Sequence, residues 1–130
     1  MRRSQYLNAI LHHMIKVINK PITINQARTE AQQVFGDMIK VVVDLELGIM
    51  AINGELHADE EKLLLEQGSK QQNLWGITLY VDLFGDPDWL EFDSMINLRP
   101  SHGNHTRGVD DVAVQKKIRE VVSRLVVSKK

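Results

Sequence analysis

The chain has 130 residues, of which 43% are apolar and 25% charged, and its 16 basic and 17 acidic side chains leave a net charge of −1. This composition is typical of a globular chain that can bury a core, and the charge balance argues against a nucleic-acid backbone as its main partner. The lack of cysteine excludes disulfides, thiolate metal sites and cysteine nucleophiles. Without a run of about 18 apolar residues, we expect no membrane span and a cytoplasmic protein.

The first 13 residues are interpreted as an N-terminal extension. Two arginines and a partly apolar stretch start the chain, but polar residues interrupt that stretch and no small-residue cleavage site follows, unlike in a secretory signal. A short strand is predicted over Met14–Ile18, and Met14 is an alternative start of translation. We therefore expect a loosely ordered extension over 1–13 and a single α+β domain over 14–130.

A helix is predicted over 24–35. Thr23 and Gln26 form a capping-box pattern, and apolar residues recur on one helical face up to a terminal glycine. Two valine-rich or apolar strands, 38–45 and 49–53, follow with only a short turn between them. That spacing predicts an antiparallel hairpin.

The second half of the chain repeats this alternation. A short helix is predicted over 59–67, with Asp59 as its N-cap and Gly68 as its end. Turn-forming residues then separate two further strands, and a single apolar stripe marks the last helix. These three elements are predicted over 74–81, 90–98 and about 110–127.

The order β-α-β-β-α-β-β-α predicts an α+β fold with a mostly antiparallel sheet of four to five strands and helices mainly on one face. Strand 90–98 alternates, which places Glu91, Asp93 and Asn97 on the face turned to water or a partner. Other strands carry apolar residues on both faces, which one helical layer cannot cover. We therefore expect a homodimer formed through the sheet face away from the helices.

The loop that follows the last predicted strand holds the densest group of polar side chains. Arg99 and Arg107 can bind a carboxylate or phosphate bidentately, and Ser101 and Asn104 can add hydrogen bonds. Alternatively, these residues form an ordinary polar surface loop, because the acidic pair 110–111 at the next helix start would repel an anion.

A second candidate site is the junction around His57. His57 can act as a general base oriented by Glu55 or Asp59, and together with His102 and His105 it can contribute to a divalent-metal site. No metal-binding spacing supports that site, and Asp59 has the simpler role of a helix cap. We expect no cofactor.

Two further features have a functional and a structural interpretation. Glu91 and Asp93 would stand about 7 Å apart on one strand face, where they can do acid–base chemistry if burial raises one pKa, or remain solvated charges. Trp75 and Trp89 can stack on a ligand or pack in the core. The chain matches no phosphate-binding loop, nucleophile elbow or zinc signature.

Three motifs resemble those of a family of small prokaryotic proteins of unknown function: Gly54–Asp59 (GELHAD), Leu74–Gly76 (LWG) and Asn97–Asn104 (N-[IL]-RP-x-x-GN). The similarity spans about 14–127, and family members start near the position of Met14, which supports the extension. The family has no assigned reaction, so the resemblance implies no role for any residue.

The resemblance also bears on the candidate residues. Family members need not carry histidine at the positions of His102 and His105, which weakens the metal hypothesis. The matched polar and aromatic set is then Glu55, His57, Asp59, Trp75, Arg99 and Asn104.

These observations favour a binding module for a small anionic ligand or a protein partner. Its site would use Arg99, Ser101, Asn104, His57, Glu55 and Trp75. The alternative is a small hydrolase in which His57 acts with Glu55 or Asp59, with or without a metal. The two hypotheses differ in whether His57 and the Arg99–Asn104 loop must share one cleft.

Overall fold

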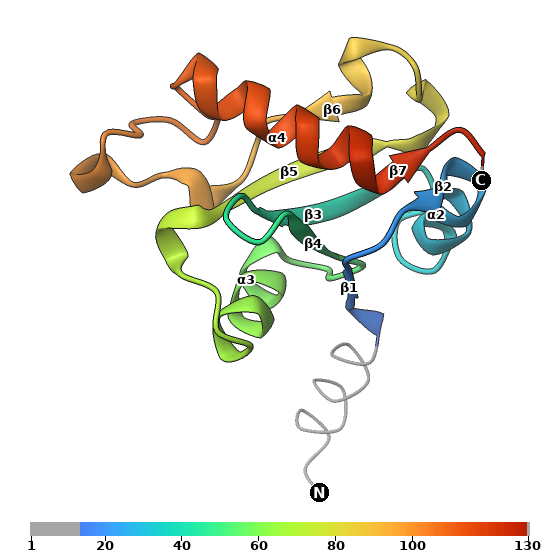
Figure 1. Ribbon diagram of the computed structural model, residues 1–130, viewed down its shortest axis with the longest axis horizontal. Helices are drawn as coiled ribbons and strands as arrows, with labels where there is room; N and C mark the ends of the chain where they lie inside the picture. Colours follow the sequence, from blue (N-terminus) through green and yellow to red (C-terminus); the bar gives the residue numbers. More distant parts are fainter. Residues whose placement is uncertain (1–13, 130) are drawn as a thin grey trace, which may run out of the picture.

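The computed structural model describes residues 14–129 (Figure 1). The predicted extension over 1–13 lies outside the described residues. Five strands form the central sheet in the order β1-β4-β3-β5-β6, and every neighbouring pair is antiparallel. The strands are β1 (Lys16–Ile18), β3 (Met38–Asp44), β4 (Ile49–Ile52), β5 (Leu74–Tyr80) and β6 (Leu90–Glu91). The predicted α+β class and antiparallel sheet are confirmed.

Two helices, α2 (Ile24–Gln32) and α4 (Val112–Leu125), pack on one face of the sheet (Figure 1). The predicted capping box starts α2, since the Thr23 hydroxyl accepts from the Gln26 N–H and the Gln26 side chain accepts from the Thr23 N–H. Asp111 caps α4 by accepting from the Ala113 N–H. The main core therefore lies between these helices and the sheet.

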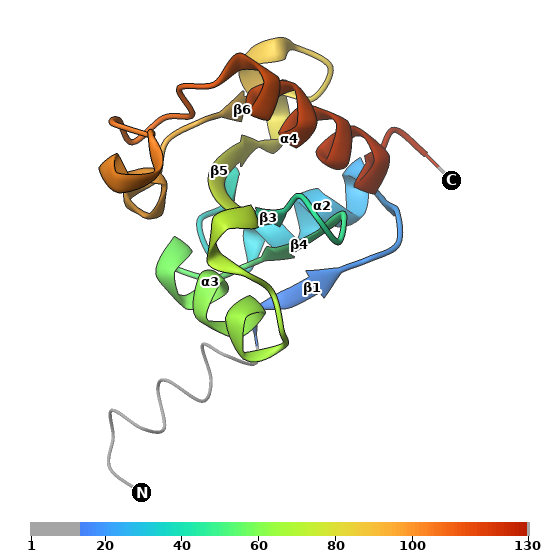
Figure 2. The ribbon, with the colours of Figure 1, turned by 60° about the vertical axis from the view of Figure 1, so that its left-hand side comes forward.

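The third helix, α3 (His57–Glu66), lies on the opposite face of the sheet (Figures 1 and 2). Its Leu64 packs with Val42, Ala51 and Leu74 in a second, smaller core. The helices are thus mainly, but not all, on one face. The apolar residues beneath α3 are covered within the chain, which removes the reason for expecting a second copy there.

The start of α3 differs from the prediction of a helix over 59–67. The helix begins at His57, and Leu56 is an N-cap without a side-chain cap hydrogen bond. Asp59 lies in the first turn instead of at the cap. This shift brings His57 onto the helix itself.

The predicted strand over 90–98 is wrong beyond Glu91. A short 3-10 turn, η4 (Met95–Asn97), replaces its second half, because the Ser94 hydroxyl accepts from the Ile96 N–H at 3.3 Å. Asn97, which was predicted to face water or a partner, is 0% exposed. Polar side chains therefore take over the hydrogen bonds that a continued strand would have made.

Several short elements complete the described chain. A parallel pair, β2 (Ile22–Thr23) and β7 (Val126–Val127), was not predicted and joins the segment before α2 to the end of α4. The remaining 3-10 turns are η1 (Gln71–Asn73), η2 (Val81–Leu83), η3 (Pro87–Trp89) and η5 (Pro100–His102). Within residues 14–129, no helix combines the length and apolarity needed to cross a membrane.

Candidate functional site

A cleft of about 350 Å³ opens beside α3 on the face of the sheet that α3 partly covers. We call it the sheet cleft. Its floor is a cross-strand row formed by Lys40 of β3, Thr78 of β5 and Glu91 of β6, in which Lys40 pairs with Thr78 and Thr78 with Glu91. Because directly paired residues point to the same face of a sheet, the three side chains share this floor.

Two walls rise from the floor and meet over Gly76. One wall is the start of α3, Leu56–Ala58, and the other is the segment Asp93–Ile96. A Cβ atom at Gly76 would lie 2.5 Å from the Cβ and Oγ of Ser94 and 3.2 Å from Cδ2 of His57. Only a glycine at this position allows both walls to approach β5 so closely.

The imidazole of His57 is held in one tautomer. Its Nε2 lies 2.7 Å from the carbonyl oxygen of Ile77, and since a carbonyl can only accept, Nε2 carries the proton and Nδ1 the lone pair. Burial lowers the pKa of His57, and the nearby cations Lys40 and Arg107 add to that shift, against the Ile77 hydrogen bond and Asp93. His57 is therefore a neutral hydrogen-bond acceptor at pH 7.

Thr78 is the most unusual polar residue of the floor. It is only 6% exposed, yet its hydroxyl has no hydrogen-bond partner among residues 14–129 and is not among their fully enclosed unpaired atoms. A hydroxyl that opens into a cleft can hydrogen-bond to water or to a bound molecule. The hydroxyl thus remains available to a molecule in the cleft.

The charged residues of the cleft differ in whether they already have a partner within the protein. Glu91 accepts from the Tyr80 hydroxyl at 2.9 Å, which raises the pKa of Tyr80, and Asp93 forms a surface ion pair with Arg107 at 2.8 Å. Lys40 forms no ion pair within the described part of the chain. Its Nζ lies 5.2 Å from the centroid of the Phe35 ring, so Lys40 is a cation of the cleft without a carboxylate partner in these residues.

The first turn of α3 adds backbone donors to this wall. The Asp59 N–H donates to the Leu56 carbonyl at 3.1 Å, whereas the N–H groups of His57 and Ala58 have no acceptor in the helix. Free N–H groups at a helix start attract anions. Lys40, Thr78, Nδ1 of His57 and these amides therefore give the cleft both donors and acceptors.

Glu60 lies one turn below His57 on the buried side of α3. It is 0% exposed, and its Oε2 accepts from the Gly54 N–H at 2.9 Å while Oε1 is unpaired within residues 14–129. Burial raises the pKa of Glu60 well above its usual value. Glu60 supports the start of α3 but does not line the cleft.

Arg99 and Trp75, which were predicted to bind ligand, lie in a second hollow of about 380 Å³. We call it the Trp75 hollow; its lining residues are Gln71, Gln72, Trp75, Arg99, His102 and Asn104. The Arg99 guanidinium stacks 4.2 Å from the Trp75 ring centroid and donates to the carbonyls of Gln71 at 2.8 Å and Leu74 at 2.5 Å. These contacts tie the Arg99 loop to the start of β5.

Both polar atoms of the Asn104 side-chain amide form hydrogen bonds. Its Nδ2 donates to the carbonyls of Asn97, Thr106 and Gly108, and its Oδ1 accepts from the Asp110 N–H. All four bonds fold the loop onto itself. Asn104 therefore shapes this loop from within.

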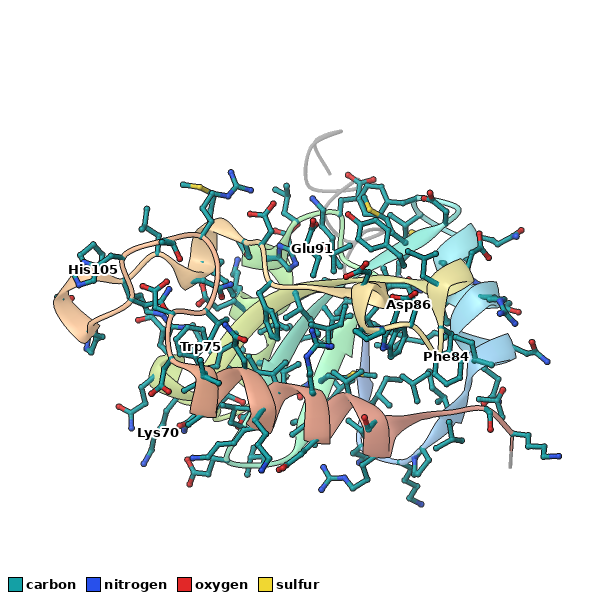
Figure 3. All side chains as sticks on the ribbon, turned by 90° about the horizontal axis from the view of Figure 1, so that it is seen from above. Lys70, Trp75, Phe84, Asp86, Glu91 and His105 are labelled. Carbon is teal, nitrogen blue, oxygen red and sulfur yellow. The ribbon has the colours of Figure 1, made fainter. Side chains whose placement is uncertain are left out.

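The remaining predicted residues are dispersed. His57 lines the sheet cleft and His102 the Trp75 hollow, where Ser101 Oγ lies 3.2 Å from His102 Nδ1. His105 lies at the outer end of the loop, with Trp75 further in toward the sheet (Figure 3). Among residues 14–129, no group of three or more His, Asp or Glu side chains could hold a metal ion.

The two carboxylates proposed to orient His57 do not contact it. Glu55 is exposed, and neither it nor Asp59 hydrogen-bonds His57 in the part of the chain that the structure describes. The carbonyl of Ile77 takes that position. His57 also lines a different hollow from Arg99 and Asn104.

Sequence reasoning missed Lys40 and Thr78. Each is a polar residue inside an otherwise mostly apolar strand, and this pattern could have pointed to both of them. Their pairing across β3 and β5 depends on the strand register, which the sequence does not display.

A family model described as "Protein of unknown function (DUF5674)" matches residues 16–125. The chain belongs to the DUF5674 family. The resemblance to a family of unknown function is therefore confirmed, and every residue of the sheet cleft lies within the segment that the DUF5674 model matches. Neither the curated proteins nor the solved structures gave a significant match.

Proposed function

We propose that this chain is a binding module for a small ligand with an anionic group, and that the ligand occupies the sheet cleft. The observation that carries the proposal is Thr78, a residue only 6% exposed on the floor of an open cleft, whose hydroxyl is unpaired among the described residues and is not enclosed by them. A purely structural threonine would gain from a hydrogen-bond partner or from replacement by valine. Its position instead supports a role in binding.

The surrounding groups support an anionic group in the ligand. Lys40 supplies a cation without an ion-pair partner within residues 14–129. The first amides of α3 supply N–H donors at the wall, and the neutral Nδ1 of His57 can accept from a protonated or hydroxyl group of the ligand. Of the residues predicted for the site, this proposal retains His57. It replaces Arg99 by Lys40 as the residue that binds the anion.

Two other occupants or activities rank below this one. Another copy of the chain could cover the same face, because Leu56 and Met95 beside the cleft are large, apolar and exposed. A hydrolase that uses His57 as a general base would need a group that orients the ring and stabilises its protonated form. The Ile77 carbonyl orients the ring but lacks the negative charge of a carboxylate. Measuring the oligomeric state of the same samples that are used for the unfolding experiment tests whether a second copy binds there.

The test is the free energy of unfolding with and without phosphate and acetate at constant ionic strength. An anion at a hundredfold its dissociation constant should raise stability by about 2.7 kcal/mol. The gain should be lost in Lys40→Gln and kept in Lys62→Gln, which removes an exposed lysine from the other side of α3. Equal gains in both variants would reject the sheet cleft as the site.

Thr78→Val is the sharper variant. Because the hydroxyl has no protein partner to lose, the variant should be at least as stable as the wild type without ligand, yet gain less from the anion. A structural role predicts the reverse pattern, with lower stability and an unchanged response to the anion.

A further inference from the structure

The sheet cleft carries opposite charges at its two ends. On the floor, Thr78 lies between Lys40 of β3 and Glu91 of β6. Glu91 accepts from the Tyr80 hydroxyl with one carboxylate oxygen, which leaves the second oxygen for another donor. The wall beyond Glu91 adds the balanced pair of Asp93 and Arg107. A ligand with only negative charge would meet repulsion at the Glu91 end.

The distance between the two ends fits a small ligand with two charges. Lys40 and Glu91 are two strand spacings apart, which is roughly 9.6 Å between their backbones. Because both side chains are flexible, their charged ends can reach the two charged groups of one small ligand that lies over Thr78.

The rim of the cleft is apolar on both sides. Leu56 on the α3 wall is 57% exposed and Met95 on the opposite wall is 61% exposed. Met38 and Ile96 add apolar surface to the same cleft. A polar floor beneath an apolar rim is the usual arrangement of a site that orients a ligand by its charged end and buries its hydrocarbon part.

Resting on the proposed function, we propose that the ligand is an α-amino acid with an apolar side chain, bound as a zwitterion. Its carboxylate binds Lys40 and the free amides of His57 and Ala58. Its ammonium donates to Glu91 and to the Thr78 hydroxyl. Its side chain lies between Leu56 and Met95.

The test compares leucine with three analogues that each lack one of its groups, by calorimetric titration of the full chain at pH 7. The analogues are 4-methylpentanoate without the ammonium, 3-methylbutylamine without the carboxylate, and glycine without the side chain. Leucine should bind, and each analogue should bind at least about tenfold more weakly, since a charged hydrogen bond or a buried side chain is lost.

A matched pair of variants tests the ammonium end separately. Glu91→Gln keeps the acceptor for Tyr80 but removes the charge, so it should weaken the binding of leucine at least about tenfold. The same change removes a repulsion for 4-methylpentanoate and should not weaken its binding. Asp88→Asn, an exposed acidic residue outside the cleft, should change neither.

The outcomes separate this inference from the proposed function. Equal binding of leucine and 4-methylpentanoate, or an unchanged affinity for leucine in Glu91→Gln, would reject the zwitterion and retain an anion-binding module. Failure of leucine, 4-methylpentanoate, phosphate and acetate alike to bind would reject both.

Discussion

The side-chain amide of Asn97 pairs with both backbone groups of Gly76, accepting its N–H at 2.8 Å and donating to its carbonyl at 2.9 Å. It thereby acts as one residue of a neighbouring strand, at the place on β5 where β6 no longer runs alongside. A further bond from Nδ2 to the Arg107 carbonyl at 3.0 Å fixes the far wall of the sheet cleft.

Replacing Asn97 should therefore cost stability. Asn97→Ala leaves both backbone groups of Gly76 without partners in a buried place, whereas the Arg107 carbonyl keeps the Ser94 N–H as a donor. We therefore expect a loss of roughly 2–4 kcal/mol. Urea denaturation measures it. Asn73→Ala, whose amide reaches only the exposed Glu46 carboxylate, should cost well under half as much, and similar losses in both would contradict the role assigned to Asn97.

Because the cleft walls approach Gly76 closely, a larger residue there should lower stability, and a smaller residue at Ser94 should restore part of that stability. Gly76→Ala places a methyl group against Ser94 and His57, and overpacking of this kind costs about 1–3 kcal/mol. Ser94→Gly removes the nearest atoms, so the double variant should recover much of the loss that the alanine causes. Denaturation of the four proteins in a double-mutant cycle gives the coupling; simple additivity would argue against the contact.

The buried carboxyl of Glu60 should make stability depend on pH. Its pKa is raised in the folded state by burial, so the unfolded chain releases this proton first and stability falls as pH rises above about 4.5, by at most about 1.4 kcal/mol per unit. The fall ends once pH passes the folded pKa. Glu60→Gln keeps the acceptor for the Gly54 N–H and removes the titration.

The stabilisation by Glu60→Gln should accordingly grow between pH 5 and pH 8. His57 contributes the opposite slope below about pH 6.5, because its lowered pKa makes the folded state resist protonation, but that contribution is common to both proteins and cancels in the difference. Glu66→Gln, an exposed change on the same helix, should show no such growth. A difference that is constant with pH would contradict a raised pKa for Glu60.

We expect Arg99 to stabilise the fold and not to bind the ligand. Lysine cannot both stack on Trp75 and donate to two carbonyls, so Arg99→Lys should lower stability by about 1–2 kcal/mol and leave the affinity of the sheet cleft for its ligand unchanged. Arg28→Lys, at an exposed arginine 4.0 Å from Asp82, serves as the control. Loss of ligand affinity in Arg99→Lys at full stability would return the site to the Trp75 hollow.

Local signals in the sequence predicted the parts of the fold that depend on near neighbours. The capping box at Thr23 starts α2, and the two strands around the 45–48 turn form the β3–β4 hairpin. The strand over 90–98 failed because Asn97 finds its partner at Gly76, 21 positions away. No local pattern reports such a contact.

The same distinction explains the site. His57 was selected from the sequence, but its partner Ile77 lies 20 positions away, and the row of Lys40, Thr78 and Glu91 exists only once three strands are in register. Arg99 was selected for chemistry that suits anions, although its donors bind carbonyls of its own chain. Residue type alone does not distinguish these roles.

The most direct test of the sheet cleft is a two-dimensional 1H–15N NMR titration of the uniformly labelled chain with leucine. We predict saturable shifts confined to the amides of Met38–Lys40, Leu56–Ala58, Gly76–Tyr80 and Glu91–Ile96, and their loss in Lys40→Gln. Shifts centred on Gln71–Trp75 and Arg99–Asn104 would contradict the sheet cleft as the site, and no shifts at millimolar leucine would contradict an amino acid as its ligand.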